Sequence, residues 1–167
     1  MSIAQSLLPE YDHEMATTRK HLARTPLAHK DWKPHPKSMT LGALAVHLAE
    51  IPSWTAVTMT QTALDMNPPG GPSYTPPVFT TVDAMLASFD AQVKAGREAL
   101  AAARDADFMV PWSLKSAGQV FFTMPRIAVI RSFVLNHLIH HRGQFTVYLR
   151  LKDVPVPQTY GPSADEA

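Results

Sequence analysis

The stretch that decides the fold is IAVIRSFVLNHLIHHRGQFTVYL, residues 127–149. Its apolar and histidine side chains recur at spacings of three and four residues, which places them on one face of an α-helix. Pro155 follows the pattern, so the helix is expected to begin near Thr123 or Met124 and to end at about Leu151. The face consists of Ile127, Ile130, Val134, His137, Leu138, His141, Phe145, Tyr148 and Leu149.

Three more amphipathic segments precede this helix in the chain. The first runs from about Ile3 to Thr25. The second begins after Ser38, a candidate N-cap, and continues past Pro52, which should kink the helix without ending it. The third runs from about Val82 to Ala103. Each has the helical period of apolar residues, so the sequence predicts four helices.

Two long connections separate the predicted helices. Residues 67–77 read NPPGGPSYTPP, and the repeated prolines and glycines indicate a loop. Residues 105–123 lack a helical period and contain Ser116-Ala117-Gly118, which indicates a small hairpin or an irregular crossover. The pattern predicts an all-α protein, a four-helix bundle with a short irregular or hairpin crossover before the last helix. We expect residues 1–167 to form a single domain.

The composition narrows the classes of function. The 15 basic and 14 acidic residues leave a net charge of +1, which argues against nucleic-acid and anionic membrane partners. The absence of cysteine excludes disulfides, thiolate nucleophiles and cysteine-ligated metals. Neither a signal-peptide pattern nor a run of about 18 uncharged apolar residues occurs, so we expect a soluble cytoplasmic protein.

The eight histidines include a pair with metal-ligand spacing. His137 and His141 are four residues apart, so both imidazoles point from the same face of the last helix. His47 lies on the apolar face of the second helix, flanked by Leu44 and Leu48. Three inward imidazoles are the number expected of an open metal site. The alternative is that each is a core histidine hydrogen-bonded to a protein oxygen.

Two segments resemble one family. NHLIHHRGQ, residues 136–144, resembles the HxxxHRGQ signature in the last helix of the DinB-like superfamily. LGALAVHLAEIPSW, residues 41–54, resembles the second helix of that family with its single histidine. The resemblance extends over the whole chain in the order of its helices. It implies a four-helix bundle, usually dimeric, in which His47, His137 and His141 hold a divalent metal ion, nickel or zinc.

The resemblance leaves two kinds of function open. Relatives include thiol-dependent transferases that use mycothiol, bacillithiol or glutathione, and a maleylpyruvate isomerase. The first hypothesis is therefore an enzyme whose metal activates a thiol or a water for transfer or hydrolysis on a small electrophilic substrate. Because the chain has no cysteine, any thiol must come from a low-molecular-weight cosubstrate. The second is a non-catalytic metal- or small-ligand-binding bundle protein of a stress response.

Two further residues are candidate catalytic groups. Gln144 lies seven residues after His137, on nearly the same face, and is expected either to orient a ligand or to bond another helix. Tyr11 lies on the apolar face of the first helix, where its hydroxyl would act in the site or only pack in the core. Glu50 points about 60° away from His47, which favours thiol activation over hydrolysis.

The same reasoning gives two expectations about contacts between protein groups. Arg142, within the signature, is expected to form an ion pair or a dimer contact. The chain beyond Pro52 has more apolar residues than one core face requires, namely Trp54, Met59 and Leu64. Together with the resemblance, this excess predicts a homodimer.

Overall fold

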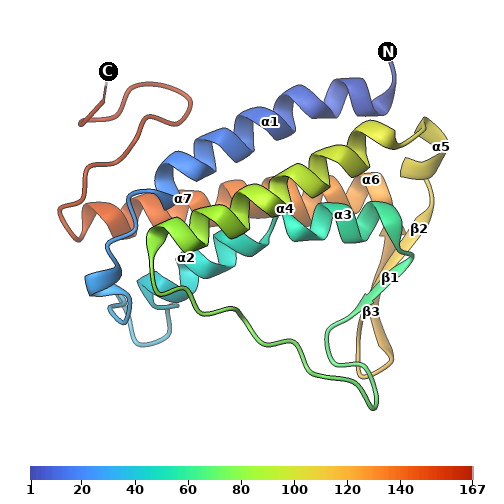
Figure 1. The fold of residues 1–167 in the computed structure, drawn as a ribbon, viewed down its shortest axis with the longest axis horizontal. Helices are drawn as coiled ribbons and strands as arrows, with labels where there is room; N and C mark the ends of the chain where they lie inside the picture. The colour runs from blue at the N-terminus through green and yellow to red at the C-terminus, as the bar shows by residue number, and fades with distance from the viewer. Residues whose placement is uncertain (167) are drawn as a thin grey trace.

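Four helical stretches pack together in the computed structural model, which describes residues 1–166 (Figure 1). The first, α1, packs against α4 and α7, and α2 packs against α4 and α7 from another side. The predicted helices are therefore present, with a small sheet added at one end. The stretches are α1 (Ile3–Leu22), α2 (Leu41–Glu50) with α3 (Ser53–Thr60), α4 (Val82–Ala102), and α6 (Arg126–Val129) with the π-helix η2 (Ile130–Asn136) and α7 (His137–Arg150).

Side-chain caps begin three of the helices. Ser2 and Gln5 form a capping box at α1, in which each side chain bonds the other residue's backbone N–H. The N-cap of α2 is Thr40, whose hydroxyl accepts from the Ala43 N–H at 3.1 Å. The expectation of Ser38 at this position is therefore wrong by two residues. Thr81 caps α4 in the same way.

Pro52 divides the second helical stretch. The residue before it, Ile51, still donates its N–H to the His47 carbonyl at 3.2 Å. The following turn tightens to three-residue bonds, from Trp54 to Ile51 and from Thr55 to Pro52. Because proline has no N–H, the series of helical hydrogen bonds is interrupted there. The stretch therefore forms two helices, α2 and α3, and not the single kinked helix that was expected.

A three-stranded sheet shows that the all-α prediction is incomplete. Strands β2 (Pro111–Ser116) and β3 (Gln119–Pro125) form an antiparallel hairpin, as one of the two alternatives proposed. Ala117 and Gly118 form its turn with φ of 51° and 78°, which suits the right-handed twist of the strands. Strand β1 (Ala63–Asp65) pairs in parallel with β2 and was not predicted. Two short helices, η1 (Leu27–His29) and α5 (Asp105–Phe108), complete the elements.

The last helical stretch contains a wide turn. It begins at Arg126, because β3 continues to Pro125, and not at residue 123 or 124. Residues 130–136 then form a π-helix that leads directly into α7 at His137. π-Helical turns occur frequently at functional sites.

A buried ion pair joins α1, α7 and the C-terminal segment. Arg142 of α7 pairs with Glu14 of α1 at 2.7 Å, and both side chains are almost fully buried. The guanidinium also donates to the Thr18 hydroxyl at 3.1 Å. Tyr160, from the segment after α7, accepts from Arg142 and donates to Glu14. The structure therefore confirms the ion-pair alternative for Arg142.

No helix in residues 1–166 combines the length and the apolar character needed to cross a membrane.

Candidate metal centre

Three histidines converge between α2 and α7. The Nε2 atom of His137 lies 3.2 Å from Nε2 of His47 and 2.8 Å from Nε2 of His141. His137 and His141 are one turn apart on α7, and the packing of α2 against α7 brings His47 to them. The three candidate ligand atoms all lie within 4.8 Å of one another. The three-His group could therefore hold one metal ion.

The outer ring nitrogens of two histidines already have partners. Nδ1 of His137 lies 3.4 Å from the Phe133 carbonyl, and Nδ1 of His141 lies 2.7 Å from Oε1 of Gln144. Both partner oxygens can only accept, so each Nδ1 carries the proton and each Nε2 has an unshared pair. Two unshared pairs then face each other at 2.8 Å, which is unfavourable unless a cation lies between them.

The donor set fits a divalent metal ion. Bonds from zinc to imidazole nitrogen are about 2.0–2.1 Å long, so nitrogens separated by about 3 Å are within reach of one ion. Hydrogen bonding of the outer nitrogen, as at His137 and His141, is the usual way in which ligating imidazoles are oriented. The three rings could therefore hold a divalent metal ion.

The environment keeps all three imidazoles uncharged. The pKa of His47 is lowered to about 4, first because the ring is buried and then because His141 and His137 lie beside it. Burial also lowers the pKa of His137 and of His141, although their Nδ1 hydrogen bonds act in the opposite direction. Metal ligation requires neutral histidine, so the three rings are in the ligating form at neutral pH.

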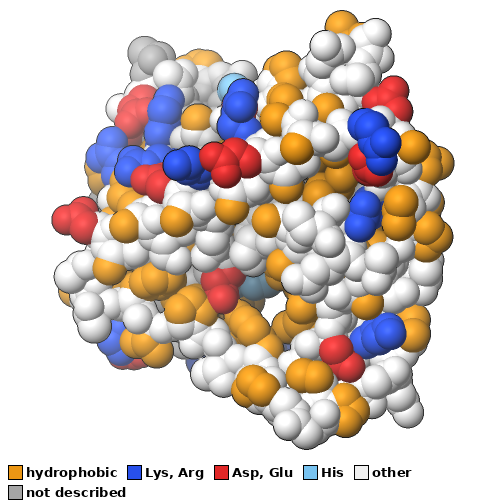
Figure 2. All heavy atoms as spheres, turned by 45° about the vertical axis from the view of Figure 1, so that its right-hand side comes forward, with side chains coloured by type: hydrophobic (Ala, Val, Ile, Leu, Met, Phe, Trp, Pro, Cys, Tyr) orange, Lys and Arg blue, Asp and Glu red, His pale blue; other side chains and the backbone are white. Residues whose placement is uncertain are grey.

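A cavity of about 80 Å³ opens beside His47 and His137. On the face shown in Figure 2, an acidic and a histidine side chain lie together at a hollow ringed by hydrophobic side chains. Glu50 lines the cavity, and the Tyr74 hydroxyl donates to its carboxylate at 2.5 Å. The other residues that line it are Ile51, Trp54, Met66 and Phe133.

Glu50 corrects one expectation, and Tyr74 is a residue that sequence reasoning missed. Although Glu50 lies about 60° from His47 around the helix axis, both residues line the same cavity. Glu50 is also the last residue of α2, two residues before Pro52. The only sequence signal for Tyr74 is that it is the one aromatic residue among residues 67–77.

The structure brings Gln144 to the histidines but not Tyr11. The Gln144 side chain bonds His141 from its own helix, α7, and within residues 1–166 it bonds no other helix. Tyr11 is fully buried, and its hydroxyl donates to the Val93 carbonyl of α4 at 3.3 Å. Burial raises its pKa to about 12. A catalytic role for either residue stays a prediction.

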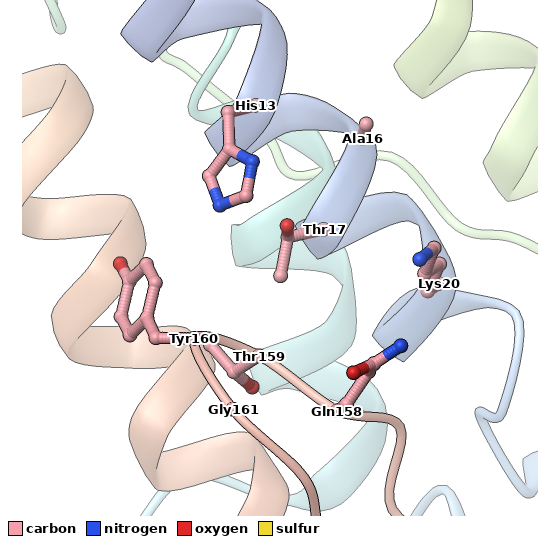
Figure 3. Close-up of a pocket in the computed structure, with 8 residues that line it drawn as sticks. All are labelled: His13, Ala16, Thr17, Lys20, Gln158, Thr159, Tyr160 and Gly161. Atoms are coloured by element: carbon pink, nitrogen blue, oxygen red, sulfur yellow. The ribbon is translucent and has the colours of Figure 1, made fainter. Parts of the chain in front are cut away.

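A larger cavity lies elsewhere. It has about 420 Å³ and lies between α1 and the C-terminal segment (Figure 3). The rings of His13 and Tyr160 are stacked there with centroids 6.2 Å apart, and Lys20 stands farther along α1. None of the predicted site residues lines this cavity.

A family model described as the DinB superfamily matches residues 10–145. Two solved structures are similar over nearly their full length. A DinB-like protein from Bacillus cereus ATCC 10987 has a TM-score of 0.69 and 24% identity, over 95% of this chain and 98% of that chain. A DinB-like protein from Bacillus subtilis has a TM-score of 0.65 and 14% identity, over 96% and 98% of the two chains. No curated protein matches the chain.

Proposed function

Since this chain belongs to the DinB superfamily, we propose that His47, His137 and His141 together bind one divalent metal ion, nickel or zinc. The observation that supports this most directly is the convergence of the three Nε2 atoms, two of them with unshared pairs facing each other. Three imidazoles bind several late first-row ions, so the choice of nickel or zinc follows from the family resemblance and not from the donor set.

We propose further that the site is catalytic and acts on a small electrophilic substrate. When bound, the ion would lower the pKa of a thiol or a water and so provide a nucleophile at neutral pH. Three histidine ligands leave open coordination positions, and the cavity beside His47 and His137 gives a small molecule access to them. Gln144 holds the His141 ring in the ligating orientation. A thiol nucleophile would come from a low-molecular-weight cosubstrate, since the sequence has no cysteine.

The position of Glu50 keeps both nucleophiles in the proposal. Its carboxylate lines the cavity, so a proton acceptor stands near the position of an activated water as well as of a thiol. The reason given above for preferring a thiol, the lack of an inward carboxylate, therefore no longer applies.

The proposal is tested on protein purified without chelators or nickel affinity resin. Elemental analysis is expected to find up to one equivalent of nickel or zinc per chain. The loaded protein is then screened for transfer of glutathione, bacillithiol or mycothiol to small electrophiles. A second screen tests the hydrolysis of activated esters, and the His47→Ala variant is the inactive control in both. Metal content that is equal in the His47→Ala variant would contradict the site. Metal binding without turnover in either screen would favour the non-catalytic alternative.

Gln144→Ala is expected to weaken metal binding about 10- to 100-fold, the usual effect of removing a group that orients a ligating histidine. The side chain is exposed, so the fold should be unaffected. The measurement is the dissociation constant by calorimetry, with Gln119→Ala, the same change at an exposed position of β3, as the control. Equal affinities in the two variants would mean that the Gln144 contact does not support the site.

Acid is expected to destabilise the loaded protein more steeply than the metal-free protein. In the metal-free fold the pKa of His47 is lowered to about 4 and those of His137 and His141 are lowered too, below the unfolded value of about 6.5. The unfolded chain then binds more protons, so stability falls as the pH drops below about 6.5. In the loaded protein, three protons compete with one metal ion for the three imidazoles. The loss of stability between about pH 7 and 5 is therefore steeper than in the metal-free protein.

The measurement is the melting temperature against pH for both forms. The two curves should converge at low pH, where the metal has left. Parallel curves would mean that the metal does not bridge His47 to His137 and His141.

We also propose a homodimer, on the basis of the resemblance. The residues first cited for it have roles within the chain: Met59 is in the core, and Trp54 and Leu64 line a cavity. Val147 and Leu151 on the last helical stretch are more than half exposed and are available for a partner. Sedimentation is expected to give the mass of two chains, and a monomer at micromolar concentration would contradict the proposal.

A further inference from the structure

Two cavities meet beside the three-His group. The cavity that contains His47 and Glu50 has about 80 Å³, and a neighbouring one has about 270 Å³. Trp54, Met66 and Tyr74 line both of them. The two cavities therefore adjoin at these three residues, and a movement of the Tyr74 side chain would join them into one pocket that reaches the histidines.

The charged side chains that line this pair of cavities have one sign. Glu50 lines the inner cavity and Asp65 lines the outer one, and neither is lined by a lysine or an arginine. The Asp65 carboxylate is held in place by the N–H groups of Asn67 and Gly118, at 3.0 and 2.8 Å. The remaining wall is mostly aromatic and apolar, with Trp54 shared by both cavities. A carboxylate among aromatic faces is an arrangement that recognises organic cations.

The Tyr74 hydroxyl occupies the position at the Glu50 carboxylate where a ligand could donate a hydrogen bond. Burial and the adjacent Glu50 raise the pKa of Tyr74, so its hydroxyl keeps the proton and donates to the carboxylate. The Tyr74 backbone is attached by a bond from its N–H to the Met66 carbonyl at 2.9 Å. The side chain is about half exposed, at 48%. A ligand with a stronger donor could therefore take its place without disturbing a helix.

We propose that the paired cavities bind a small organic ammonium ion with an apolar body, whose N–H groups replace the Tyr74 hydroxyl at the Glu50 carboxylate. The apolar body lies against Trp54 and Met66. Ammonium is favoured over a neutral donor because a charged donor forms a stronger hydrogen bond to a carboxylate. In the metal-free pocket, carboxylate ligands are excluded because they would meet Glu50 and Asp65. The inference rests on the proposed function only in treating the pocket as a substrate site, since the binding itself requires no metal.

The test compares three probes that share a phenyl group: 2-phenylethylammonium, 2-phenylethanol and 3-phenylpropionate. Binding is measured by calorimetry at pH 8 on metal-free protein, because a bound zinc ion with open positions would itself take the carboxylate probe. The ammonium probe is expected to bind about tenfold or more tighter than the alcohol, and the carboxylate probe is expected not to bind. Equal or tighter binding of the carboxylate probe would overturn the proposal.

Two variants and a control locate the site. Glu50→Gln should weaken ammonium binding about tenfold or more, because the charged partner is lost. Tyr74→Phe should strengthen it, because the competing hydroxyl is removed, whereas a purely structural role of Tyr74 predicts no gain. Glu98→Gln makes the same charge change at an exposed position of α4 and should have no effect. Unchanged affinity in Glu50→Gln, or no gain in Tyr74→Phe, would overturn the proposal.

The outcome is separable from that of the proposed function. Zinc affinity is measured on the same samples and depends on the histidines, whereas ammonium affinity depends on Glu50. Ammonium binding without zinc binding would support this pocket and contradict the metal site, and the reverse result would do the opposite.

Discussion

His137→Ala is expected to abolish metal binding, with an affinity loss larger than the about 100-fold upper range for groups that only orient a ligand. His137 is the central member of the group, since its Nε2 lies within 3.2 Å of both other Nε2 atoms. The metal-free variant is expected to be less stable than the metal-free wild type, because the half-buried ring and its Nδ1 bond to the Phe133 carbonyl are removed. Metal content and dissociation constants from calorimetry measure the loss of metal binding. Thermal unfolding measures the stability of the metal-free variant.

His140→Ala is the matched control. Its ring lies 4.9 Å from that of His141 on the same helix, but it is not part of the three-His group. It should keep full metal stoichiometry. If His137→Ala and His140→Ala bind metal equally well, the metal is held elsewhere.

Arg142→Met is expected to destabilise the fold by about 3–5 kcal/mol, the usual cost of leaving one partner of a buried ion pair uncompensated. The variant keeps the volume of the side chain but leaves the Glu14 carboxylate with the Tyr160 hydroxyl as its remaining partner. In a chain of this size each kcal/mol lowers the melting temperature by about 2–4 °C, so a fall of about 6–20 °C is expected.

The double variant Arg142→Met, Glu14→Gln separates the charge effect from packing. Removing the buried charge as well should restore part of the lost stability, because no unpaired carboxylate remains. Urea unfolding of both variants and of the exposed-pair variant Arg97→Met gives the comparison; the exposed pair with Asp12 should contribute at most about 1 kcal/mol. A loss below that level in Arg142→Met would show that the pair is not what fastens α1 to α7.

Helical periodicity predicted the features that depend on spacing along one helix. The faces of the four stretches follow from it, and so does the shared direction of His137 and His141. The meeting of His47 with this pair was also predictable, because the apolar face of each helix must point into the same core. These features require only that the helices pack together, and do not depend on loop geometry.

The features that the sequence did not reveal depend on contacts between distant segments. Strand β1 has three residues and exists through its pairing with β2, so no local pattern marks it. Tyr74 reaches Glu50 from a proline-rich loop whose path is set by neither periodicity nor turn chemistry. The division at Pro52 arises where a kinked helix loses its hydrogen-bond ladder, and sequence alone does not tell a kink from a break.

The π-helix before α7 has a consequence for length variation in this family. A π-turn contains one residue more than an α-turn, so deleting one residue from 130–136 would convert it to α-helix while the residues on either side keep nearly the same directions around the helix axis. His137 and His141 lie downstream and would keep their spacing, and α6 and the hairpin that precedes it would keep nearly their orientation. The wide turn is therefore a place where the last helical stretch can gain or lose one residue without rotating the hairpin relative to the histidines.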